Sequence, residues 1–123
     1  MIGYVTLGTN DLPRATAFYD ALLAEFGAKR IMDLGDGYLW AASMDRPGIM
    51  IKAPYDKNAA TVGNGVMVAL VVNAKDKVDR IHKKALDLGA KDEGPVGDRG
   101  GGFYGGYFRD LDGNKLNVFC MVK

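Results

Sequence analysis

One order of predicted elements occurs twice in this chain, and that repeat constrains its fold more than any other feature of the sequence. A Gly-Ala-Lys tripeptide at residues 27–29 returns at 89–91, about sixty residues later, each time directly after a predicted helix. In both copies a short apolar strand precedes the helix and further strands follow it. The repeat predicts an α+β fold of tandem βαβββ modules, with module one at about 1–58 and module two at about 64–123.

The first copy shows the elements of such a module in order. Residues 2–7 alternate as a strand in which Tyr4 and Thr6 share one face. Asn10 or Asp11 can cap the helix that follows, and a glycine ends it. Glycine and proline then separate three short strand-like runs, at 30–34, 38–43 and 49–53.

The second copy follows a polar segment at 54–65, which lacks periodicity and is predicted to be a linker. A β-branched strand at 66–72 comes next, and Asn73 can cap a helix that ends at Gly89. Residues 92–104 are rich in glycine and indicate an irregular segment before the last two strands.

The last two strands form a predicted β-hairpin. Asp110 and Asn114 can close a three-residue loop with Gly113 in the left-handed conformation, which places Tyr107 opposite Asn117. The two-residue period of a strand then gives two faces, with Leu116, Val118 and Cys120 on one and Asn117, Phe119 and Met121 on the other. The first face is core, and the amide on the second face is a candidate ligand contact.

Composition excludes several kinds of partner. The 123 residues, 48% of them hydrophobic, suffice for one globular domain. A net charge of +1 provides no attraction to nucleic acid or to an anionic membrane, so we expect neither as a partner. The single cysteine, Cys120, allows no intrachain disulfide, and no apolar run is long enough to span a bilayer. We therefore expect a cytoplasmic protein.

The repeat and its hairpin resemble the vicinal oxygen chelate superfamily, which contains glyoxalase I, extradiol dioxygenases, and fosfomycin-resistance and bleomycin-resistance proteins. The resemblance covers the whole chain and is carried by Asn-Asp-Leu at 10–12, Phe-Tyr at 18–19, Gly-Asn-Gly at 63–65, and residues 103–116 with their Asp-Leu-Asp-Gly-Asn-Lys. It implies that each module forms a curved mixed sheet and that the two sheets enclose a cup for a small molecule. It also implies a homodimer.

The family pattern implies a divalent metal, but the matching positions lack its usual ligands. They hold Tyr4, Met50, Met67 and Asn117, which supply a phenol, two thioethers and an amide in place of imidazole and carboxylate. His82, the only histidine, lies on the second predicted helix, where a partly exposed side chain is expected. The sequence therefore predicts neither a metal nor another cofactor.

A small-molecule site that is apolar and aromatic with a few polar groups is expected in the cup. Arg99 would lie at its mouth, where it could pair with a carboxylate or phosphate. The candidate ligand-binding residues are Tyr4, Thr6, Tyr38, Trp40, Met50, Met67, Arg99, Tyr104, Tyr107, Asn117 and Phe119.

Three functions remain open at this point. The first is a metal-free protein that binds a small molecule, which the missing metal ligands favour. The second is a lyase or isomerase of glyoxalase type that acts on a small anionic substrate, with Tyr4 or Tyr104 as general acid and Arg99 orienting the substrate. Nothing in the sequence lowers the pKa of either tyrosine toward neutral pH, so catalysis stays open. The third is an interaction module whose cup is vestigial.

Overall fold

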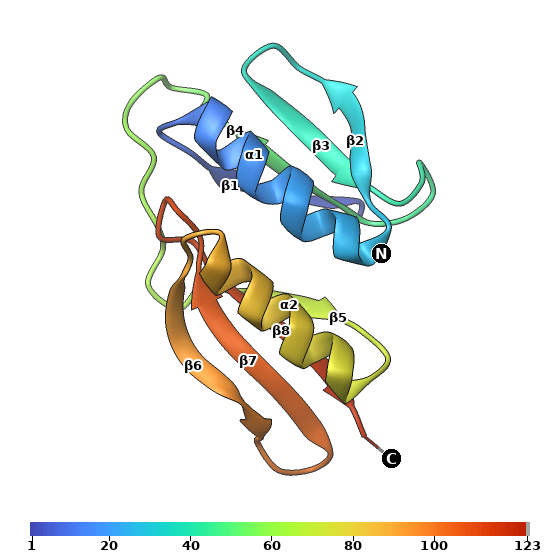
Figure 1. The fold of residues 1–123 in the computed structure, drawn as a ribbon. Coiled ribbons are helices and arrows are strands. Elements are labelled where there is room, and N and C mark those ends of the chain that lie inside the picture. The colour runs from blue at the N-terminus through green and yellow to red at the C-terminus, as the bar shows by residue number, and fades with distance from the viewer. Residues whose placement is uncertain (123) are drawn as a thin grey trace. The chain divides into compact units, whose positions relative to one another are not determined.

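The computed structural model describes residues 1–122, and the chain divides into two compact units. The first module runs from Met1 to Val62, and the second module begins at Gly63. Each contains one strand, one α-helix and three further strands, and in each the helix lies across one face of a four-stranded mixed sheet (Figure 1). The predicted α+β fold of two βαβββ modules is confirmed.

The first module has the sheet order β1-β4-β3-β2, in which β1 pairs with β4 in parallel and the other pairs are antiparallel. Its elements are β1 (Tyr4–Gly8), α1 (Leu12–Leu23), the 3-10 turn η1 (Ala24–Phe26), β2 (Lys29–Asp33), β3 (Gly37–Ala41) and β4 (Gly48–Lys52).

Helix α1 begins and ends as local sequence chemistry dictates. Of the two candidate caps, Asp11 is the N-cap, because its side chain accepts a hydrogen bond from the Arg14 N–H at 3.1 Å. Asn10 instead exchanges hydrogen bonds with the backbone of Ala60. Gly27 ends the helical segment with a φ of 71°. The helix buries an apolar stripe against the sheet, formed by Ala15, Phe18, Tyr19, Leu22 and Leu23.

The second module has the same arrangement, with sheet order β5-β8-β7-β6 and a parallel pair of β5 and β8. Its elements are β5 (Val68–Val71), α2 (Lys75–Asp87), β6 (Lys91–Asp98), β7 (Phe103–Arg109) and β8 (Lys115–Met121).

The predicted hairpin is confirmed in register and in turn geometry. Tyr107 pairs with Asn117, and the Asp110 N–H donates to the Asn114 carbonyl at 2.9 Å. Gly113 has a φ of 90°, the left-handed conformation that the three-residue loop requires.

Two expectations for the second module are wrong. Residues 92–104 are not mainly irregular, because β6 occupies most of their first half and pairs with β7. Its ladder shifts register on both sides of Gly94, so the segment lacks the alternation that reveals a strand. Asn73 does not cap α2. The N-cap is Ala74, which makes no side-chain capping hydrogen bond, and the side-chain oxygen Oδ1 of Asn73 accepts from the Lys77 ammonium at 2.8 Å.

Candidate functional site

Each sheet has one face covered by its own helix, and strand alternation assigns every side chain to that face or to the opposite one. In the second module the Tyr104 hydroxyl donates to Asp79 of α2, and the Phe108 ring lies 6.3 Å from that of His82. Residues 104, 106 and 108 of β7 therefore face the helix, and 103, 105 and 107 face away. We call this second surface the helix-free face of the second module. It carries Phe103, Gly105, Tyr107, Lys115, Asn117 and Phe119.

Asn117 lies at the centre of the helix-free face and is 0% exposed. Its amide nitrogen donates to the Gly106 carbonyl at 2.9 Å, with a longer contact of 3.4 Å to Val118. Its amide oxygen, Oδ1, is buried and has no hydrogen-bond partner within residues 1–122. A buried acceptor without a partner costs about 1–3 kcal/mol. The site thus presents one acceptor for which a donor is missing.

Aromatic rings flank this amide. The rings of Phe103 and Phe119 stack at 4.8 Å between centroids with an interplanar angle of 8°. Gly105 lies opposite Phe119 in the ladder, and a Cβ there would come within 3.0 Å of the Phe103 ring and of the Asn117 amide nitrogen. The glycine is therefore required for this close packing of rings and amide.

Tyr107 is the third aromatic residue of this face, and two cationic side chains lie over its ring. The Arg99 guanidinium carbon lies 5.5 Å from its ring centroid, and the Lys115 ammonium lies 5.4 Å from it. Arg99 also donates to the Pro95 carbonyl. Neither cation forms an ion pair with a carboxylate in the described part of the chain. Sequence reasoning singled out Arg99 but did not include Lys115, which entered only as the last residue of the Asp-Leu-Asp-Gly-Asn-Lys motif.

The first module also has a helix-free face. Tyr4 and Thr6 are exposed on it, and Met50, which pairs with Thr6, is buried. Met67 of the second module directly precedes β5 and is partly exposed. These four residues remain candidate ligand-binding residues, for the reasons given in the sequence analysis.

Tyr38 and Trp40 do share one face of β3, but it is the helix-covered face, so the expectation that they line the cup is wrong. The register pairs Trp40 with Ile49, whereas Met50 pairs with Leu39, so Trp40 and Met50 point to opposite sides. The Trp40 indole N–H donates to Asp20 of α1 at 2.9 Å, and the side chain is 1% exposed. Trp40 belongs to the packing between α1 and its sheet, and the half-buried Tyr38 lies beside it, with the two ring centroids 6.0 Å apart.

Tyr104 likewise differs from its expected position. Its hydroxyl donates to Asp79 on the helix-covered face, and the Lys75 ammonium lies 5.2 Å from its ring. The hydrogen bond to the Asp79 carboxylate raises the pKa of Tyr104, because ionisation would place two negative charges together. A tyrosine that acts as an acid near neutral pH needs the opposite shift.

His82 is buried rather than partly exposed. It is 5% exposed, and its Nε2 lies 3.1 Å from the Tyr107 carbonyl and 3.4 Å from the Asp92 carboxylate. The charged residues around it on α2 suggested an outer position, but the imidazole sits on the inner stripe with Val78, Ile81 and Ala85.

The donor chemistry does not fit the divalent metal that the family pattern implies. Phenol, thioether and amide groups are poor ligands for zinc, nickel, iron or manganese. No cluster of three or more histidine, cysteine, aspartate or glutamate residues that could hold a metal ion occurs within residues 1–122.

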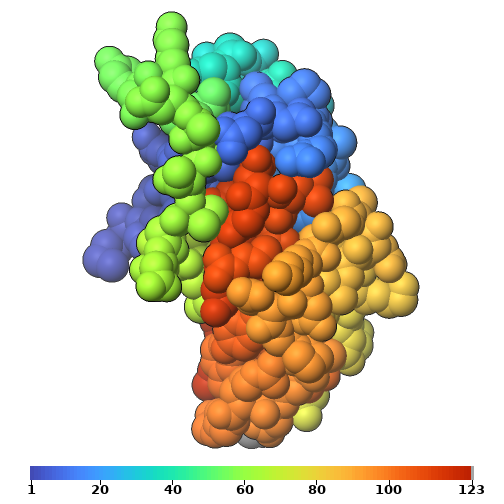
Figure 2. All heavy atoms as spheres, turned by 90° about the vertical axis from the view of Figure 1, so that its left-hand side faces the viewer, coloured from blue at the N-terminus to red at the C-terminus, as the bar shows by residue number. Residues whose placement is uncertain are grey.

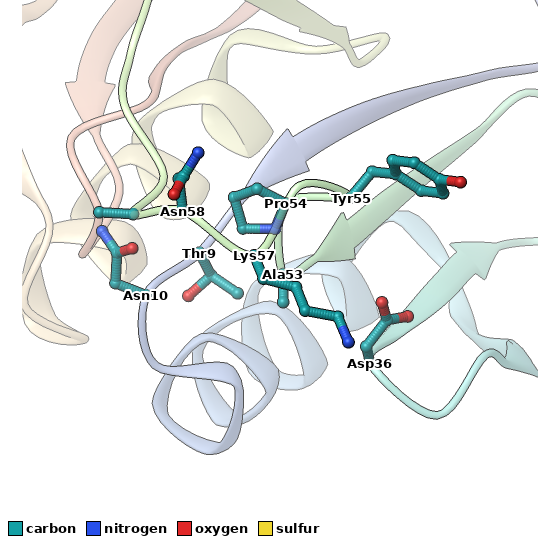
Figure 3. A pocket seen from close by; sticks show the side chains of 9 residues that line it. Thr9, Asn10, Asp36, Ala53, Pro54, Tyr55, Lys57 and Asn58 are labelled. Carbon is teal, nitrogen blue, oxygen red and sulfur yellow. The ribbon is translucent and has the colours of Figure 1, made fainter.

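A hollow of about 350 Å³ lies in the first module, outside the predicted site (Figure 3). Part of its wall is the segment after β4, which protrudes in green in Figure 2. Some of its polar side chains already have partners outside the lining, as Asp36 has Lys52 at 2.6 Å and Asn10 has the Ala60 carbonyl at 3.1 Å. We assign no function to it. The lining residues are Thr9, Asn10, Asp36, Ala53, Pro54, Tyr55, Lys57, Asn58 and Ala59.

Comparison with known proteins identifies the family of this chain. The model of the Glyoxalase/Bleomycin resistance protein/Dioxygenase superfamily matches residues 1–118. The chain belongs to this superfamily.

Solved structures agree with this family. A glyoxalase/bleomycin resistance protein from Albidiferax ferrireducens is 30% identical, with a TM-score of 0.89 and 98% of each chain covered. A glyoxalase/bleomycin resistance protein/dioxygenase family enzyme from Burkholderia phytofirmans is 18% identical, with a TM-score of 0.78 and 98% of each chain covered.

A lactoylglutathione lyase from Agrobacterium tumefaciens is 22% identical, with a TM-score of 0.70; the match covers 98% of this chain and 92% of that one. These last two likenesses show the fold alone. No curated protein sequence matches the chain. No helix within residues 1–122 is both long enough and apolar enough to cross a membrane.

Proposed function

We propose that this protein binds a small molecule without a metal and that the ligand contacts the helix-free face of the second module. The observation that carries the proposal is the buried, unpartnered oxygen of Asn117. Its cost to the free protein is recovered if a ligand supplies the missing N–H or O–H donor.

The surroundings of Asn117 support a ligand of organic character. The stacked Phe103 and Phe119 rings and the Tyr107 ring give an apolar surface, and Asn117 supplies one directed polar contact. Pockets for small molecules combine these two features. The hydrogen bond to Asp79 shifts the pKa of Tyr104 away from the value that acid catalysis requires, so Tyr104 does not support the lyase or isomerase alternative.

Substitution of Asn117 by leucine tests the proposal directly. We expect benzamide, whose amide can donate to Oδ1, to bind the parent protein and to bind Asn117→Leu about fivefold more weakly, because a buried hydrogen bond is worth about 1 kcal/mol. Binding is followed by two-dimensional NMR as shifts of the Gly105, Asn117 and Phe119 amide signals.

The control is Asn73→Leu, the same chemical change at the residue before α2, which should leave binding unchanged. The stability of Asn117→Leu should stay within about 1 kcal/mol of the parent, because loss of the bond to Gly106 is offset by removal of the unpaired oxygen. Equal affinity of benzamide for the parent and for Asn117→Leu would exclude Asn117 from the site.

Metal content provides a separate test. We expect purified protein to retain no stoichiometric zinc, nickel, iron or manganese after dialysis against a weak chelator, because the donors at the four matching positions do not suit these ions. Elemental analysis measures the content, and the melting temperature should be the same with and without added zinc. One equivalent of any of these metals per chain would contradict the proposal.

A further inference from the structure

The glycine-rich segment between β6 and β7 has no role in the proposed contact with Asn117, but it positions a charge. A Cβ at Gly97 would come within 2.9 Å of an Arg99 guanidinium nitrogen, and a Cβ at Gly94 would come within 3.0 Å of the Tyr107 ring and 3.5 Å of the guanidinium. A side chain at Gly97 would push the Arg99 guanidinium aside, and one at Gly94 would press on the Tyr107 ring. The two glycines therefore form a cradle in which the guanidinium lies against Tyr107.

The cation held in this way is not neutralised. Arg99 uses one of its donors on the Pro95 carbonyl, which leaves most of the five N–H groups of a guanidinium for another partner. Lys115 brings a second positive charge to the same ring. Glu93 of β6 is paired with Arg109 at 2.8 Å, and the charge of Lys115 also contributes to lowering the pKa of this carboxyl. Two cations at one ring, neither of them in an ion pair with a carboxylate within residues 1–122, favour an anion.

The charges also lie next to the acceptor of the proposed site. Tyr107 and Asn117 are directly opposite in the β7–β8 ladder, and side chains of such pairs are about 5 Å apart at Cβ. A ligand held by the cations at Tyr107 would therefore lie close to the unpaired oxygen of Asn117.

We infer that the ligand is a small organic anion, a carboxylate or phosphate with an apolar body and a hydrogen-bond donor, whose anionic group is held by Arg99 and Lys115 over Tyr107. The inference rests on the proposed function, whose site it shares, and adds the chemical class of the ligand. The planar fork of an arginine suits both carboxylate and phosphate.

The experiment compares salicylate, phenyl phosphate and the neutral salicylamide by the same NMR titration in the parent, Arg99→Met, Lys115→Met and the double variant. We expect the parent to bind at least one anion about tenfold more tightly than salicylamide, which is the effect of one good charged contact. The double variant should lose this preference and keep its affinity for salicylamide. Added salt should weaken anion binding to the parent only. The stronger of the two anions identifies carboxylate or phosphate as the natural group.

Two further variants separate charge from structure. Arg99→Lys should retain part of the preference, and Lys83→Met, which removes a lysine paired with Asp87 on α2, should retain all of it. Equal binding of anions and salicylamide to the parent would overturn the inference and leave the proposed function standing. Absence of binding by all three compounds would overturn both. An equal loss of salicylamide binding in the double variant would show that Arg99 and Lys115 support the fold of the site rather than select charge.

Discussion

Trp40→Ala is expected to lower the free energy of unfolding by about 3–5 kcal/mol, the range for removal of a large buried aromatic side chain. Trp40 is 1% exposed between β3 and α1, and its ring lies 6.0 Å from that of Tyr19. The substitution removes this packing and also the hydrogen bond from the indole to Asp20. Urea denaturation followed by far-ultraviolet circular dichroism measures the loss without relying on the fluorescence of the residue that is changed.

One further variant keeps an aromatic ring at position 40, and another serves as a control at an exposed aromatic residue. Trp40→Phe keeps most of the ring and should cost less than the alanine variant, because Asp20 retains Arg30 as a partner at 3.1 Å. Tyr55→Ala removes an aromatic ring that is 94% exposed and should change stability by less than about 0.5 kcal/mol. A Trp40→Ala protein as stable as the Tyr55→Ala protein would place Trp40 outside the core.

Gly37→Ala is expected to destabilise the protein by an amount at the upper end of about 1–3 kcal/mol, although it adds a single methyl group. That methyl would lie 2.5 Å from the Ile51 carbonyl oxygen and 2.8 Å from the Lys52 Cα, both in β4. Because the obstacles are backbone atoms of the strand that pairs with Gly37, no side-chain rotation can relieve the overlap.

The matched control is Gly3→Ala, which adds the same methyl group just before β1, where no atom lies within 4 Å of it. Gly3→Ala should be neutral within about 0.5 kcal/mol, so the difference between the two alanine variants isolates the overlap from the general effect of replacing glycine. The melting temperatures of Gly37→Ala and Gly3→Ala measure this difference in stability. Equal values would mean that β3 and β4 are further apart at Gly37 than the structure has them.

Features set by neighbouring residues could be predicted from the sequence. The β7–β8 hairpin is fixed by its own three-residue loop, so its register and the two faces of β8 followed directly. The repeated order of elements predicted the α+β fold, because each copy contains the apolar pattern of one helix and the patterns of several strands.

Features set by pairing between distant strands could not be predicted. Alternation showed that Tyr38 and Trp40 share a face, but which face depends on the register of β3 against β4. Strand β6 was missed because its glycines and two register shifts remove the expected period. The burial of His82 was missed because charged neighbours on α2 concealed an inner position that the Tyr107 carbonyl satisfies.

The order of strands in each sheet leaves four outer strands, and they differ in how well they resist pairing with another chain. β2 carries exposed Lys29 and Asp33, and β6 contains a proline and two irregularities of its ladder, all of which discourage the addition of a foreign strand. β1 and β5 lack these devices and expose Tyr4 and Val71. Aggregation of partly unfolded protein should therefore begin at β1 and β5, and charged substitutions for improved solubility are best placed on those two strands.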